Sequence, residues 1–288
     1  MKCKFCANKA IYDEERLCKE HFNKYFEKRV KKYFDSLRLK NLKLLIAVSG
    51  GKDSSAVAYS LNNIKDNYNL SLELLYLDLG IKKYSESCKQ TAIKLSDSLG
   101  LKLNILDLPK LYHKSIDDFD KSYACSACGT FKRYLINKFA FENNFDYVIT
   151  GHNLDDELFF VMNNLLNRNT EYLLRSGKMT ETKRELKLVG RFKPLYYLTE
   201  KESLILCIAN NIPFTNIECP HGFNSTQLRM KKELNHFFDK RSKKINFIKS
   251  INNIKKEYKE QTSELMNFCE ECGYPTNSKV CRFCRLVK

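Results

Sequence analysis

Cysteines and one histidine occur near both ends of the sequence, mostly in pairs separated by two residues. The first set consists of Cys3, Cys6, Cys18 and His21, and the second consists of Cys269, Cys272, Cys281 and Cys284. Thiolate sulfur and imidazole nitrogen are ligands that zinc prefers, and four of them close a tetrahedral structural site. The spacing therefore predicts two bound Zn²⁺ ions that stabilise folding and take no part in catalysis.

Three further cysteines, Cys125, Cys128 and Cys219, form an incomplete tetrahedral set. Cys219 is followed by a proline, a context found in iron–sulfur ligation. We interpret the three as ligands of a [4Fe-4S] cluster whose fourth iron is open. The alternative is a redox pair of Cys125 and Cys128 that forms a persulfide or disulfide during sulfur transfer. The remaining Cys88 and Cys207 are expected to be structural thiols.

A glycine-rich segment follows the first apolar run and reads Ser49-Gly50-Gly51-Lys52-Asp53-Ser54. Between a strand and a helix, backbone N–H groups and the positive end of the helix dipole converge on a bound anion. The segment is not a Walker A loop, which has four residues between its first glycine and its Gly-Lys pair. It resembles the pyrophosphate loop of the ATP pyrophosphatase superfamily, whose members leave AMP on an acceptor oxygen and release pyrophosphate. The resemblance implies that this segment holds the phosphates of ATP, and that Asp53 holds Mg²⁺ or orients the acceptor.

A second polar segment reads Gly151-His152-Asn153-Leu154-Asp155-Asp156 and follows another strand-like run. It should emerge at the same edge of the sheet as the glycine-rich loop, which places Gly151 beside the nucleotide. The adjacent carboxylates of Asp155 and Asp156 suit magnesium binding or general-base catalysis. A plain helix N-cap would also explain the pair, and the two roles are compatible.

Apolar runs alternate with helical stretches through the centre of the chain. Strands are expected at 42–48, 72–77, 102–106 and 146–150, and helices at 54–62, 84–99, 130–143, 155–168 and 200–211. Strands separated by helices imply right-handed crossovers and an α/β fold with a doubly wound parallel sheet. A basic amphipathic stretch follows at 225–259.

The sequence carries 50 Lys and Arg against 34 Asp and Glu, a net charge of +16. The excess is concentrated in two flanks, residues 1–40 and 229–260. It favours a polyanionic partner such as RNA, although basic helices are often only solvated faces. No signal peptide or apolar run long enough for a membrane span is present, so we expect a soluble, cytoplasmic protein without a membrane partner.

Together these motifs resemble the TtuA/NcsA group of tRNA 2-thiouridine synthetases over nearly the whole chain. The resemblance implies an adenine nucleotide α-hydrolase-like domain, with zinc modules at both ends, that adenylates a uridine C2 oxygen in tRNA and replaces it with sulfur. Cys125, Cys128 and Cys219 would hold the [4Fe-4S] cluster, Lys132 would support catalysis, and Asp156 is favoured over Asp155 as the catalytic carboxylate. Sulfide or a thiocarboxylated ubiquitin-like carrier would donate sulfur, and a homodimer is expected. Both uridine 34 and uridine 54 remain open as the target nucleotide, and thiolation of a cytidine remains an alternative.

The expected organisation has five parts. They are an N-terminal zinc module (1–25), a basic helical linker (26–40), the catalytic domain (41–225), a basic helical segment (226–262) and a C-terminal zinc ribbon (263–288). Two other functions compete with this interpretation: pyrophosphatase-loop enzymes that attack with ammonia or an amino group, and a non-catalytic zinc-dependent RNA-binding protein. The first does not need three unassigned cysteines, and the second leaves both polar loops unexplained.

Overall fold

A five-stranded parallel sheet forms the centre of the computed structural model, which describes residues 1–222, 226–258 and 267–288. The strand order is β3-β2-β1-β4-β5. The bounds are β1 (Lys43–Val48), β2 (Ser71–Asp78), β3 (Leu103–Asp107), β4 (Tyr147–Ile149) and β5 (Gly190–Phe192). The chain steps outward from β1 to β3 and then returns to β4 on the other side of β1. This reversal between β1 and β4 is the topological switch point at which open α/β sheets bind ligands.

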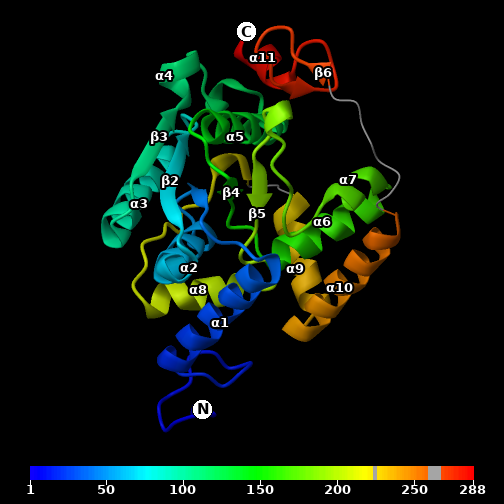
Figure 1. Cartoon of the computed structure of the whole chain (residues 1–288). Helices are drawn as coiled ribbons and strands as arrows, with labels where there is room; N and C mark the ends of the chain where they lie inside the picture. The colour runs from blue at the N-terminus through cyan, green and yellow to red at the C-terminus, as the bar shows by residue number, and fades with distance from the viewer. Residues whose placement is uncertain (223–225, 259–266) are drawn as a thin grey trace.

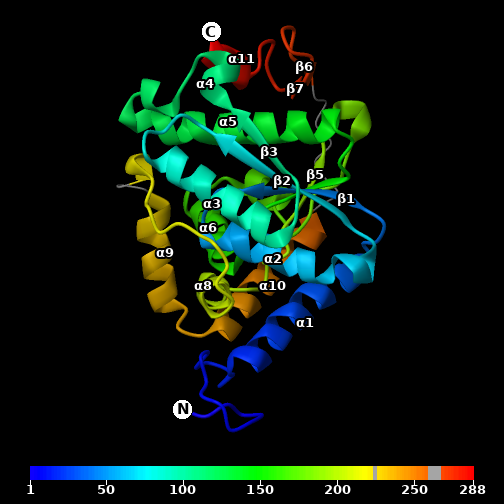
Figure 2. The ribbon, with the colours of Figure 1, turned by 90° about the vertical axis from the view of Figure 1, so that its left-hand side faces the viewer.

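Helices cover both faces of the sheet (Figure 1, Figure 2). They are α1 (Lys19–Leu37), α2 (Lys52–Tyr68), α3 (Tyr84–Leu99), α4 (Leu108–Tyr112), α5 (Lys121–Glu142), α6 (Leu154–Leu166), α7 (Thr170–Arg175), α8 (Glu200–Ala209), α9 (Thr226–Phe237), α10 (Arg241–Tyr258) and α11 (Arg282–Val287), with 3₁₀ turns η1 (Ile116–Asp118), η2 (Arg184–Leu186) and η3 (Pro220–Gly222). A small antiparallel pair, β6 (Asn267–Phe268) and β7 (Pro275–Thr276), belongs to the C-terminal module.

Alternating side chains of β1 explain why helices lie on both faces. Leu44 and Ile46 belong to the cluster formed with α1, α2, α3 and α8, whereas Leu45 belongs to the cluster formed with α5. A strand buried on both faces carries a continuous apolar run, as this segment does. The α/β class and the parallel sheet are therefore confirmed.

The four predicted strands correspond to β1 to β4, whereas β5 was not predicted because its sequence, Gly-Arg-Phe, is not an apolar run. Helix α5 begins at Lys121, four residues before Cys125, and it contains both cysteines at its opening as well as most of the helical stretch expected at 130–143. The helix expected to link the N-terminal module to the sheet begins at Lys19. It buries an aromatic face against the core.

The basic stretch expected at 225–259 forms two helices, α9 and α10, and its end residues Ser225 and Lys259 lie outside the described residues. The second helix starts at Arg241, whose backbone N–H donates to Glu14 Oε1 at 3.1 Å. A contact with the N-terminal module therefore helps to define this break.

A fully buried carboxylate, Glu202, joins the N-terminal module to the body of the molecule. It accepts hydrogen bonds from the hydroxyls of Tyr12 at 3.4 Å and Tyr25 at 2.6 Å, and from Arg241 Nε at 3.2 Å. The two terminal modules themselves lie at opposite ends of the molecule (Figure 1). Among the described residues, no helix has the length and apolar character needed to cross a membrane.

Candidate active site

The glycine-rich loop joins β1 to α2 and leaves no space for a side chain at its centre. Gly50 has a φ of +80°, and a Cβ there would lie 2.8 Å from Cys88 Cα. The first N–H groups of α2 receive no side-chain cap from the N-cap residue Gly51. Uncapped N–H groups at a helix N-terminus, preceded by glycine, fit a phosphate of ATP.

Internal hydrogen bonds hold this loop in shape. The Ser54 hydroxyl accepts from the Ser49 N–H at 3.1 Å and donates to the Gly51 carbonyl at 2.9 Å. The Gly50 carbonyl in turn accepts from the N–H of Thr215 at 2.8 Å. The loop is therefore preorganised, and it contacts the segment that leads to Cys219.

The second polar loop follows β4 and packs directly on the first. A Cβ at Gly151 would lie 2.7 Å from Ser54 N and 2.9 Å from the Asp53 carbonyl carbon. Asn153 caps α6 by accepting from the N–H groups of Asp155 and Asp156, and its side-chain amide donates to Asp53 Oδ1 at 3.1 Å. The structure thus brings together all the residues that the sequence predicted for the nucleotide site.

Carboxylates and lysines alternate at this junction. Lys52 contacts Asp53 at 3.2 Å and Glu200 at 2.6 Å, while Lys231 of α9 contacts Asp156 at 2.6 Å and Glu200 at 3.2 Å. Burial raises the pKa of Asp53, and the neighbouring carboxylates Glu200 and Asp156 raise it further. Closely spaced carboxylates beside a phosphate loop are the ligands that Mg²⁺ takes in nucleotide sites.

Asp155 differs from its neighbour Asp156 in both burial and partners. It is buried, it accepts from the N–H of Glu200 at 2.7 Å, and it pairs with Lys244 at 2.5 Å. Its oxygens therefore hold α8 and α10 in place, whereas Asp156 is only half-buried and lies on the side of Asp53 and Lys231.

The three internal cysteines come from α5 and from the segment before η3. Cys125 Sγ donates to the carbonyl of His221 at 3.2 Å, two residues beyond Cys219. Burial raises the pKa of Cys219, and the nearby thiols of Cys128 and Cys125 act in the same direction. The His221 imidazole is itself held by Asp117 at 2.7 Å. The three thiols therefore lie near one another, and their role as cluster ligands stays a prediction.

The spacing of these sulfurs differs from that of a zinc site. Unlike the terminal sets, the three ligand atoms do not all lie within 4.8 Å of one another. A tetrahedral zinc with Zn–S bonds of about 2.3 Å needs sulfurs about 3.8 Å apart. A wider set of three thiols suits a larger group, such as an iron–sulfur cluster with one iron left without a protein ligand.

Lys132 is exposed on α5, one turn beyond Cys128. Its positive charge lowers the pKa of both Cys88 and Cys219, although burial dominates and raises both. Cys88 is buried directly behind Gly50, and Cys207 is buried with its thiol donating to the Lys52 carbonyl at 3.3 Å. Both have the structural surroundings that we expected.

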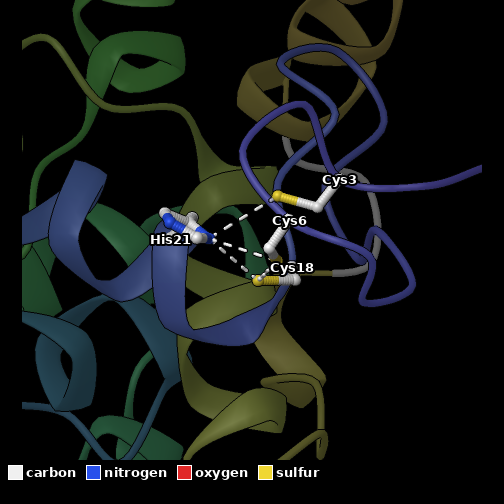
Figure 3. A group of neighbouring side chains, drawn as sticks. All are labelled: Cys3, Cys6, Cys18 and His21. Atoms are coloured by element: carbon white, nitrogen blue, oxygen red, sulfur yellow. Dashed lines mark hydrogen bonds between the residues drawn. The ribbon is translucent and has the colours of Figure 1, made fainter.

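The N-terminal set converges on one point (Figure 3). His21 Nδ1 lies 3.2 Å from Cys18 Sγ and 3.6 Å from the sulfurs of Cys3 and Cys6, and Cys6 and Cys18 are 3.6 Å apart. These separations fit the edges of a small tetrahedron around Zn²⁺.

The C-terminal set converges in the same way, with 3.7 Å between Cys272 and Cys281 and 4.0 Å between Cys269 and Cys284. Its module packs on α5 through Phe283, which stacks on Tyr134 with ring centroids 3.7 Å apart. The module therefore supports the helix that carries Cys125 and Cys128.

Sequence reasoning missed three polar residues of the site: Glu200, Thr215 and Lys231. Glu200 and Lys231 lie on helices whose sequence shows only capping and amphipathic signals, and Thr215 acts through its backbone. The packing of α8 on α2 and of α9 on α6 brings Glu200 and Lys231 to the nucleotide site.

Comparisons with known proteins agree with this geometry. The family described as "PP-loop domain" matches residues 22–219. The tRNA-5-methyluridine(54) 2-sulfurtransferase of Pyrococcus horikoshii is 38% identical over 99% of this chain and 93% of its own length. The enzyme of the same name from Thermotoga maritima is 35% identical over 100% of this chain and 96% of its own length.

Similarity extends to a solved structure, the U34-tRNA thiolase NcsA of Methanococcus maripaludis with its [4Fe-4S] cluster. The two share 26% identity and a TM-score of 0.82, and the alignment covers 99% of this chain and 95% of that one. The similarity therefore includes both terminal modules as well as the central sheet.

Proposed function

We propose a function from the family of this chain, which belongs to the PP-loop family and to its branch of tRNA 2-sulfurtransferases. The protein adenylates a uridine in tRNA and replaces the C2 oxygen with sulfur. The observation that carries the proposal is a hydrogen bond between the nucleotide loop and the segment that carries Cys219. The Gly50 carbonyl accepts from the N–H of Thr215, four residues before Cys219. One substrate atom can thus be activated and substituted without leaving the site.

The nucleotide part of the site binds and orients ATP. Lys52, the Ser49 hydroxyl and the N–H groups of Gly50 and Gly51 hold the phosphates, the Ser54 hydroxyl fixes the loop by accepting from the Ser49 N–H, and Gly151 allows the second loop to approach. Asp53 and Asp156 would together supply carboxylate oxygens for Mg²⁺, which when bound would neutralise charge on the phosphates. Lys231 then stabilises the negative charge that builds as AMP leaves the uridine.

Three thiolates, Cys125, Cys128 and Cys219, would hold the cluster. A [4Fe-4S] cluster bound there supplies an iron without a protein ligand, to which sulfide can attach. Lys132, one turn from Cys128, stabilises the charge that develops on the C2 substituent during attack. Asp155 is a positioning residue that keeps α8 and α10 against the site.

The finer assignments rest on the relatives. The relatives from Pyrococcus horikoshii and Thermotoga maritima act, by their names, on 5-methyluridine 54, so we assign this chain to position 54 in preference to uridine 34. Zn²⁺ at both ends, a cytoplasmic location and a homodimer complete the proposal. Sulfide or a thiocarboxylated ubiquitin-like protein serves as sulfur donor.

The decisive experiment has two steps. Iron and acid-labile sulfide are measured after anaerobic purification for the wild type and for Cys219→Ser, and we expect close to four of each per chain only in the wild type. The wild type is then given ATP, Mg²⁺, sulfide and unmodified tRNA, and the digested nucleosides are analysed by mass spectrometry. Absence of iron even after anaerobic reconstitution would favour a persulfide on Cys125 or Cys128.

The same assay tests the target base. Transcripts carrying cytidine at position 54 or at position 34 separate the two uridines, and only the first should lose thiolation. A 2-thiocytidine product, or release of pyrophosphate without sulfur incorporation, would overturn the assignment.

A further inference from the structure

An open pocket of about 740 Å³ lies between α5, the segment around β5 and the C-terminal module. Three arginines line it, one from each of these parts: Arg133, Arg191 and Arg282. Lys183 adds a fourth cation, and Glu181 is the only acid among the lining residues. No function described above uses this pocket.

Two of the three guanidiniums, those of Arg191 and Arg282, donate to uncharged groups. Arg191 Nη2 donates to the Arg133 carbonyl at 3.3 Å. Arg282 Nη2 donates to the hydroxyls of Tyr123 at 3.1 Å and Ser126 at 2.6 Å. In the part of the chain that the structure describes, no carboxylate forms an ion pair with any of the three guanidiniums.

Arg133 and Arg282 are exposed, Arg191 is half-buried, and their like charges repel one another. Burial lowers the pKa of Arg133, and the neighbouring Arg282 lowers it further. Burial likewise lowers the pKa of Arg191, with Arg133 as the neighbouring charge. Uncompensated guanidinium charges in one pocket are the arrangement that binds a phosphate or carboxylate with charge-assisted hydrogen bonds.

The position of the pocket indicates which anion it takes. Ser126 lies between Cys125 and Cys128, so Arg282 contacts the helix at the cysteine centre itself. The phosphates of ATP have their own loop at the N-terminus of α2, where no arginine of this pocket takes part. A nucleotide that enters the cysteine centre brings backbone phosphates on both sides of it.

We propose that Arg133, Arg191 and Arg282 form a phosphodiester-binding site that holds the RNA backbone next to the nucleotide being modified. This inference rests on the proposed function, because it supplies a site for the RNA substrate of that reaction. It also gives the C-terminal module a part in substrate binding through Arg282, beside the zinc-set residue Cys281.

The test measures the affinity of the holoenzyme for an unmodified tRNA transcript over a series of salt concentrations. Wild type is compared with Arg133→Gln, Arg191→Gln and Arg282→Gln, and with Lys94→Gln, which removes an exposed charge on α3 outside the pocket. Each arginine variant should bind about tenfold more weakly, the size expected for one charge-assisted hydrogen bond. The slope of log affinity against log salt should fall by about 1 for each phosphate that is no longer neutralised. Lys94→Gln should leave both the affinity and this slope unchanged.

Iron content and ATP affinity, measured on the same samples, show whether each variant is folded. Arg282→Gln could disturb docking of the C-terminal module, so Arg191→Gln and the charge-conserving Arg191→Lys provide a separate measurement. Arg191→Lys should keep the salt slope and weaken binding, because lysine cannot form the bidentate contact.

Two outcomes overturn the inference. Folded arginine variants with wild-type affinity and salt slope would show that the pocket does not bind RNA. The arginine variants could instead keep their RNA affinity and lose thiolation only when the sulfur donor is a thiocarboxylated carrier protein and not when it is sulfide. That result would assign the pocket to an acidic segment of the carrier. Failure of the wild type to thiolate tRNA would count against the proposed function and leave the binding measurement interpretable.

Discussion

Two lysines contribute positive charge at different stages of the proposed reaction. Lys132 lies on α5 beyond Cys128, whereas Lys231 is on α9 and pairs with Asp156 and Glu200. The first acts where sulfur attacks and the second where AMP leaves. Their substitutions should therefore have different kinetic effects.

Lys132→Ala should retain iron and ATP binding and lose thiolation by about 100-fold or more, the usual effect of removing one electrostatic stabiliser of a transition state. Single-turnover formation of thiolated nucleoside measures this step. Lys138→Ala is the matched control, because Lys138 is on the same helix and pairs with Glu142. Near-normal turnover of Lys132→Ala would remove Lys132 from the mechanism.

Lys231→Met should weaken ATP binding by about 10- to 100-fold, because Asp156 and Glu200 then lack their shared cation and repel the phosphates. Isothermal titration with a non-hydrolysable ATP analogue gives the dissociation constant. Lys232→Met, at the exposed neighbouring position, should bind like wild type. Equal affinities for both variants would contradict a role for Lys231 at the nucleotide.

At the scale of elements, the site depends on two loops that follow adjacent parallel strands. β1 leads to Gly50 and β4 leads to Gly151, and backbone contacts between the loops leave no room for a Cβ at the second glycine. The site therefore depends on the close packing of these two loops as well as on their charged residues.

Gly151→Ala should destabilise the fold by about 1–3 kcal/mol, because its Cβ meets rigid backbone of Asp53 and Ser54. ATP binding should be abolished even where the variant remains folded. Gly177→Ala is the control, since its Cβ makes only an ordinary contact at 3.8 Å with the Met179 carbonyl. Thermal unfolding and ATP titration of both proteins check the prediction, and unchanged ATP affinity in Gly151→Ala would refute it.

These elements also show how far sequence alone could lead. The strands before Ser49 and Gly151 and the pairing of Cys125 with Cys128 could be predicted, because apolar runs and a two-residue spacing are local properties. The start of α5 at Lys121, four residues before Cys125, could not be predicted because Cys, Ser and Gly near its beginning have weak helix propensity, which tertiary packing against η1 and α11 overrides. The arginine pocket and Lys231 could not be predicted, since each is assembled from segments far apart in the chain.

At the scale of the whole molecule, the C-terminal module acts as a support for the cysteine centre. Its Phe283 packs against Phe131 and Tyr134 of α5, and Arg282 bonds to Ser126. Removal of this module should therefore affect the helix that carries Cys125 and Cys128.

The combined substitution Cys281→Ser and Cys284→Ser should lower zinc from two ions to one per chain and lower the thermal midpoint, because structural zinc binding contributes directly to folding. Iron retention should fall as well, because α5 loses its packing partner. Cys125→Ser is the control, expected to lose iron while it keeps both zinc ions. Atomic absorption measures both metals, and an unchanged zinc content in the double variant would argue against the site.

The buried carboxylate Glu202 has a consequence for how the chain is made. Tyr12 and Tyr25 meet their partner 190 and 177 residues further along, and Glu14 contacts Arg241 across 227 residues. During synthesis the N-terminal residues emerge first, yet the contacts with Glu202 cannot form until α8 has left the ribosome, and the contact with Arg241 cannot form until α10 has. Such long-range contacts slow folding, so the N-terminal module should remain undocked and open to proteases or chaperones through most of translation.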